Sequence, residues 1–184
     1  MIQSARSNQF RFNFPRTFVP KIVIDKYKPY LNRIPGNIIT EPIDFINYSI
    51  QSVSFVGSSY DSVEQIDNPG IKRQFRGSLP TQELFGKELS ITFQLFDGFI
   101  NYWMMTDIFA HYYNLGGKTP YIPEGSRLEL LDSEGNIVVS VEMQRILFSS
   151  IADLELNFST NTAEFITFEC SFIYNNLKTK LELQ

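Results

Sequence analysis

The chain has 184 residues, of which 43% are hydrophobic and 20% are charged, and its formal net charge is -4. This length suits one domain, 1–184, with a substantial core and is short for two. The acidic balance argues against a protein that grips nucleic acid, because neutralising phosphates requires a basic face. A single cysteine excludes an intramolecular disulfide framework. No apolar run approaches the ~20 residues that span a bilayer, so we expect no membrane anchor.

The first 42 residues contain one clear strand and an irregular region. Residues 1–9 are polar and lack the apolar stretch of a secretory signal, so we expect a reducing, aqueous compartment or release by lysis. The alternation of FRFNF predicts a short strand over 10–14. Prolines frame the next extended piece, and KIVIDKY (21–27) is a further strand candidate. We interpret 15–42, which holds further prolines and a glycine, as an insertion or ordered arm.

A long strand with a change of parity is predicted over 43–56. Apolar residues alternate on one face up to Ile50 and on the other from Val53. This change predicts either a bulge near Gln51 and Ser52 or a strand that passes from one sheet to another. Residues 57–86 follow as a long inter-strand loop that is rich in turn formers. This loop carries the tight basic cluster of Lys72, Arg73 and Arg76.

The stretch 87–114 is the clearest pattern in the chain. Leu89, Ile91, Phe93 and Leu95 alternate with the polar residues Glu88, Ser90, Thr92 and Gln94, which is typical of a half-buried strand. After residue 97 the apolar residues recur at three- and four-residue spacing, which predicts one prominent helix over about 97–115 with Trp103 near its centre.

The C-terminal third predicts further strands. RLELL and NIVVSVEM flank DSEGN, a sequence with hairpin chemistry. A second parity change falls near Gln144 and Arg145, which again predicts a bulged strand. LELNF and the long aromatic strand ITFECSFIY follow, with Cys170 on its buried face, and then a charged tail. These elements together predict a mainly β fold, an antiparallel β-sandwich or partly open β-barrel with one prominent helix.

A search for chemistry finds little that favours an enzyme, a cofactor or a metal. His111 is the only histidine, and no second His or Cys completes a zinc site around it. No phosphate-binding glycine loop occurs. The acids Glu124, Glu129, Asp132, Glu134 and Glu142 gather near the predicted hairpin, and we favour a solvated hairpin over a carboxylate pair for glycoside chemistry. The alternative class is therefore a ligand- or carbohydrate-binding β-sandwich that uses these acids.

The order of motifs resembles the tail tube proteins of contractile phages and the related tubes of injection systems. The resemblance covers 43–176 and rests on IQSVSFVGSSYDSVEQ, GSLPTQELFGKELSITFQLFDG, FINYWMMTDIFAHYYN and the segment from RLELLDSEGNIVVSVEM to FIYN. It implies a structural virion protein that self-assembles into stacked hexameric rings, the conduit for genome delivery in a contractile tail. The Pro-rich 15–42 departs from a minimal tube protein, so a baseplate tube initiator or a secretion-type injection tube remains the alternative.

The resemblance also implies partners and surfaces. The partners are further copies of the chain, the sheath, the baseplate and the tail terminator, with DNA passing but not held. The virion would assemble in the host cytoplasm. We expect the polar face of Glu88, Ser90, Thr92 and Gln94 to line the lumen, because it has no basic residue. Contacts between subunits or rings are expected at Lys72, Arg73 and Arg76 and at Trp103.

Overall fold

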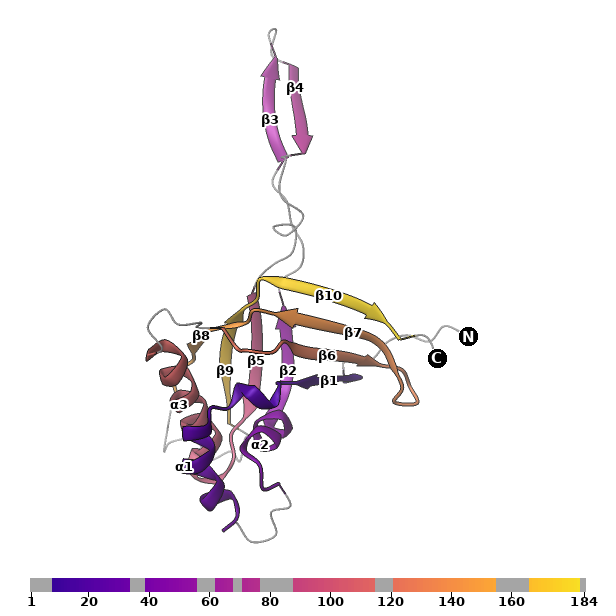
Figure 1. Ribbon diagram of the computed structural model, residues 1–184. Coiled ribbons are helices and arrows are strands. Elements are labelled where there is room, and N and C mark those ends of the chain that lie inside the picture. Colours follow the sequence, from indigo (N-terminus) through magenta and orange to yellow (C-terminus); the bar gives the residue numbers. More distant parts are fainter. Residues whose placement is uncertain are drawn as a thin grey trace, which may run out of the picture.

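A computed structural model describes residues 8–33, 39–55, 62–67, 71–76, 88–114, 121–154 and 166–182. Two four-stranded antiparallel sheets form its body. Sheet I has the order β1 (Phe10–Asn13), β6 (Ser126–Leu131), β7 (Ile137–Gln144), β10 (Asn176–Leu181). Sheet II has the order β2 (Ile50–Phe55), β5 (Glu88–Gln94), β9 (Thr167–Ile173), β8 (Leu147–Ile151). The sheets face each other with their strands crossing steeply, and the helices lie below them (Figure 1).

The predicted β-sandwich with a prominent helix is confirmed, and the described strands do not close into a barrel. The predicted helix is present as α3 (Ile100–Asn114), preceded by the 3-10 turn η3 (Asp97–Phe99). Gly98 in that turn has φ +72, a conformation that glycine adopts without steric cost. The chain therefore turns sharply from the end of β5 into α3.

Aromatic rings from both ends of the chain fill the space between the sheets. Phe172 on β9 stacks on Phe148 of β8 with centroids 4.5 Å apart, and it meets Phe14 at 5.4 Å. Phe14 in turn stacks on Phe18 at 4.2 Å. Since aromatic pairs add about 0.5–1.5 kcal/mol beyond the area they bury, this cluster ties the N-terminal segment to sheet II.

Two helices replace predicted extended segments. Residues 21–27, a strand candidate, begin α1 (Lys21–Leu31), and the first half of the predicted strand 43–56 is α2 (Pro42–Ser49). Val23, Tyr27 and Leu31 lie four residues apart and are all buried, so α1 buries one stripe. The short 3-10 helix η1 (Arg16–Phe18) precedes α1 and buries Phe18. The described part of 15–42 thus packs on the core, and its origin as an insertion stays a prediction.

Both predicted parity changes mark a switch in structure. The register between β2 and β5 shifts between Ile50 and Ser52, which confirms the predicted bulge at the start of β2. Arg145 has φ +52 and separates β7 of sheet I from β8 of sheet II. The prediction of a bulged strand at the second parity change is therefore wrong, because β7 ends there and the chain crosses from one sheet to the other.

The predicted loop 57–86 contains a hairpin in its described part. β3 (Ser62–Asp67) and β4 (Ile71–Arg76) pair along their whole length. In Figure 1 this hairpin stands away from the two sheets. A lone two-stranded hairpin is only marginally stable in water.

Candidate assembly surfaces

The first surface is the outward face of sheet II, which we call the polar wall. Its polar residues are Ser52 and Ser54 of β2, Glu88, Ser90, Thr92 and Gln94 of β5, and Glu169 and Ser171 of β9. All are at least partly exposed. Ser90 donates to the Glu169 carboxylate, and the amide of Gln51 donates to Gln94 Oε1 at 2.9 Å.

The opposite face of the same strands is dry. Leu89, Ile91 and Phe93 have no exposed surface, and neither have Cys170 and Phe172 on β9. Burial, followed by the nearby Glu169 charge, raises the pKa of Cys170 above its ordinary value, so the thiol is inert. The predicted separation of polar and apolar faces is present, and the lumen-facing role of the polar residues stays a prediction.

No strand of sheet II contains Lys or Arg, and this includes both edges. In the described structure β2 pairs only with β5, and β8 pairs with β9 and makes one bridge between Leu147 and Tyr121. Natural proteins guard free edges with charges, lysine above all. The edges of sheet I carry them, with Arg11 in β1 and Lys178 and Lys180 in β10. The edges of sheet II are thus the less guarded ones.

The hairpin presents the basic cluster in part. Lys72 Nζ lies 2.8 Å from Glu64 Oε1 across the two strands. Pairing places Arg73 opposite Gln65 and Arg76 opposite Ser62, while the two arginine side chains lie outside the described part of the structure. Ile66 is 66% exposed. Three basic residues therefore fall on one strand of a projecting hairpin, and their contact with another subunit or ring stays a prediction.

Trp103 lies at the start of α3 with 54% of its surface exposed. Its ring packs edge-on against Tyr102 at 5.5 Å, and Tyr102 packs edge-on against the buried Phe168 at 5.3 Å. Tyr102 also donates to the Ala152 carbonyl, just after β8, at 3.4 Å. Trp103 therefore stands beside the β8 flank of sheet II, where its contact with a neighbour stays a prediction.

The start of α3 is fixed by a buried amide. The Asn101 side chain, with no exposed surface, donates to the Gln94 carbonyl at 2.6 Å and accepts from the Phe96 amide at 3.3 Å. It thereby satisfies backbone groups where β5 ends. Asn101 therefore fixes the backbone at the start of α3, two residues before Trp103.

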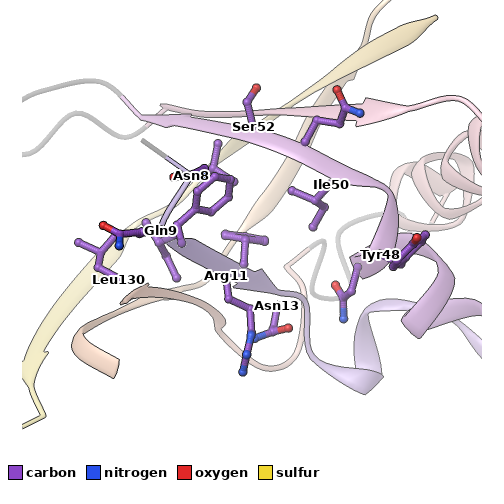
Figure 2. A pocket seen from close by; sticks show the side chains of 14 residues that line it. Asn8, Gln9, Arg11, Asn13, Tyr48, Ile50, Ser52 and Leu130 are labelled. Carbon is purple, nitrogen blue, oxygen red and sulfur yellow. The ribbon is translucent and has the colours of Figure 1, made fainter. Parts of the chain in front are cut away.

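A groove of about 1030 Å³ lies between β1 and β2, on the opposite flank of sheet II from Trp103. In Figure 2 Ile50 points into the space between the two strands. The apolar residues of its lining are Phe10, Phe12, Ile50, Val53, Leu128 and Leu130. Leu130 is 40% exposed. Sequence patterns did not indicate this groove, because it depends on how the two sheets are offset.

Asp107 joins α1 to α3. One of its carboxylate oxygens accepts from Lys26 at 2.5 Å and from the Tyr27 hydroxyl at 2.6 Å. Burial and then this hydrogen bond raise the pKa of Tyr27 above its ordinary value. His111 lies nearby, and with Lys26 and Asp107 it lines a depression of about 460 Å³. These contacts hold α1 against α3.

Glu129 and Asp132, two of the acids near the β6–β7 hairpin, make structural contacts. Glu129 pairs with Arg127 at 3.2 Å and with Arg11 at 3.7 Å. Asp132 accepts from the backbone amides of Glu134 and Asn136, both at 2.8 Å, and so closes the turn. Among the described residues no cluster of His, Cys, Asp or Glu could hold a metal. None of the described helices is both long and apolar enough to span a membrane.

Comparison with known proteins identifies the fold. No family model and no curated protein matches the sequence. A chain of the anti-feeding prophage baseplate, 6-fold symmetrised, is similar with a TM-score of 0.59 and 13% identity, over 98% of this chain and 97% of that one. The tube-terminating cap of the same prophage gives 0.57 and 10% over 99% and 94%. A chain of the extended PVC sheath-tube complex, an extracellular contractile injection system, gives 0.50 and 14% over 72% and 81%.

Proposed function

We propose that this protein, which has the tail-tube fold, is a structural, non-enzymatic ring subunit of the tube in a contractile tail or injection system. Copies would form hexameric rings that stack into a tube, with sheath, baseplate and terminator proteins as partners. The observation that carries the proposal is sheet II. One face is dry, the other is polar without a basic residue, and both edges lack charge.

Ring closure follows from these edges. A contact between different surfaces of identical copies closes into a ring when the rotation allows it. Pairing β2 of one copy with β8 of the next would satisfy both unguarded edges. Neighbouring strands in sheet II are antiparallel throughout, so β2 and β8 run in opposite directions. Copies related by rotation about an axis along the strands would therefore continue the antiparallel pattern.

The polar wall would then line the lumen. Its charged members are Glu88 and Glu169, which repel a polyanion, and its serines and threonine offer no cation to a phosphate. Genome DNA in a phage virion assembled in the host cytoplasm is the cargo that we favour. In an injection system the same wall would pass another cargo.

A terminal or baseplate ring is the second candidate. The cap and baseplate chains match nearly all of this chain, including the region of α1, while the chain from the sheath-tube complex matches 72% of it. This difference in coverage is the observation that supports a specialised ring at one end of a tube as the second candidate.

The experiment is electron microscopy of the purified protein together with mass measurement in solution. We expect rings or tubes with hexameric symmetry. A monodisperse monomer at all concentrations would contradict the proposal and favour the ligand-binding β-sandwich. A ring structure in which the polar wall faces outward would overturn the lumen assignment alone.

The hairpin is proposed as the contact to the next ring or adjacent subunit. Reversing the charges of Lys72, Arg73 and Arg76 should block stacking and leave the monomer folded. The matched control reverses Lys21, Arg33 and Lys178, which are exposed elsewhere and give the same change in net charge. Normal tubes from the hairpin variant would refute this role.

A further inference from the structure

The groove and Trp103 lie on the same side of sheet II. Ile50 pairs with Phe93, so it belongs to the buried side of the sheet, where the groove opens. Tyr102 packs on Phe168, a buried residue of the same side, and Trp103 packs on Tyr102. The apolar groove therefore lies beside one edge of this face, at β2, and the half-exposed indole of Trp103 lies beside the other edge, at β8.

The groove and Trp103 also lie at the same position along the direction of the strands. Ser52, which lines the groove, pairs with Thr92, and Thr92 pairs with Glu169. The Glu169 carbonyl accepts from the Ala152 amide at 2.8 Å, and the Ala152 carbonyl accepts from Tyr102. One row across the sheet thus starts at the groove and ends at the hydroxyl of Tyr102, whose ring packs on Trp103.

We infer that Trp103 of one copy inserts into the groove between β1 and β2 of the neighbouring copy. This inference rests on the proposed ring and adds the side chains that fix it. If β8 of one copy extends β2 of the next without a shift in height, the row above continues across the seam. The indole of the first copy then meets Ile50, Val53 and Leu130 of the second.

Charge complementarity supports a second copy as the occupant. Arg11 is the one charged residue among the described residues that line the groove, and 60% of its side chain is exposed. On the other flank Asp153 follows Ala152 and is exposed. The seam that brings Trp103 to the groove brings Asp153 toward Arg11. Tryptophan and arginine are the residue types that most often dominate the energy of an interface.

Intrinsic fluorescence tests the inference directly, because Trp103 is the only tryptophan. We expect emission from the dilute monomer to be red and readily quenched by acrylamide. On ring formation the emission should shift to the blue and the quenching constant should fall several-fold. Rings whose tryptophan stays as accessible as in the monomer would overturn the inference and leave the proposed function standing. If no rings form, the inference and the proposed function both fail.

Variants separate insertion from general packing. Trp103→Ala should raise the concentration for half assembly by at least ~10-fold, while Tyr113→Ala, which removes a 79% exposed ring from the same helix, should leave it unchanged. Leu130→Asp in the groove should act like Trp103→Ala and keep the tryptophan exposed. Leu181→Asp, at an exposed leucine of the same sheet, is its control. Equal effects from a variant and its control would overturn the inference.

Discussion

The two sheets of this sandwich differ in the charged residues that their edge strands carry. Sheet I carries charged edge strands and a network of ion pairs, in which Arg127 meets Glu182 at 3.2 Å and Lys180 meets the same carboxylate at 3.0 Å. Sheet II has no basic residue in any strand and no charge at either edge. Charged edge strands of this kind keep a sheet from pairing with the strands of other chains.

The difference suggests a division of labour within one small domain. Exposed ion pairs contribute little to stability, with a typical value of about 0–1 kcal/mol each. Their value in sheet I lies in keeping its edges from pairing with other chains. Sheet II omits this protection, which would be an aggregation hazard in a monomer and is an asset in a ring.

The largest expected effect comes from the core that both sheets share. Phe172→Ala removes a fully buried ring that contacts Phe148 and Phe14. We expect the free energy of unfolding to fall by about 3–5 kcal/mol, as for other buried aromatic truncations. Chemical denaturation measures it. Phe10→Ala, at a partly buried ring on the edge of sheet I, should cost clearly less, and an equal loss would contradict the assigned core.

The second prediction compares the edges. Ser54→Lys places a cation on the β2 edge, where it should raise the concentration for half assembly at least ~10-fold. The monomer should keep its stability within about 0.5 kcal/mol, as for most surface changes. Sedimentation measures assembly. Thr179→Lys on β10 is the matched change in sheet I and should have no effect, so equal inhibition by both would remove the distinction between the sheets.

The helices offer a third test, because α1 packs on α3 and α3 packs on β8 of sheet II. Asp107→Asn removes the carboxylate that holds Lys26 and Tyr27. Since Asp107 is partly exposed, we expect a loss of about 1 kcal/mol, with faster hydrogen exchange in α1. Asp25→Asn on the exposed face of α1 is the control. Unchanged exchange in the Asp107 variant would show that the aromatic core alone anchors α1.

The smallest effect is a pH dependence in sheet I. Hydrogen bonds from Asn136 hold the pKa of Asp132 below its ordinary value of 3.8. A lowered folded-state pKa stabilises the protein above the unfolded-state value, and this contribution is lost as the pH falls through the folded-state value. Asp132→Asn should therefore flatten the decline in melting temperature below about pH 4. An identical decline in both proteins would contradict the prediction.

The fold predictions that the structure confirms rest on strong local periodicity. Leu89, Ile91 and Phe93 alternate with polar residues, and β5 forms as predicted. Residues 21–31 also contain a helical stripe, Val23, Tyr27 and Leu31, yet IVI mimics strand alternation and the flanking prolines favoured an extended interpretation. The eight residues of α2 likewise fit both a strand pattern and a helix pattern. Short apolar runs fit both periods, and packing decides between them.

The candidate surfaces also differ in whether a local sequence pattern predicts them. The polar wall follows from alternation along one strand, so its residues could be named from the sequence. The groove needs β1 and β2, which lie far apart in the chain, to meet at one flank, and no local pattern encodes that. Inside 57–86 the turn formers Asn68-Pro69-Gly70 separate two polar alternating runs, a hairpin pattern that the prediction of a long loop does not include.

The buried Asn101 has a kinetic consequence. It fixes the first turn of α3 to the end of β5, so the segment that carries Trp103 is ordered when the monomer folds, before any copies meet. Preorganised contact residues lose little conformational freedom on docking, which favours slow dissociation. Asn101→Ala should then shorten the lifetime of assembled rings more than it slows their formation.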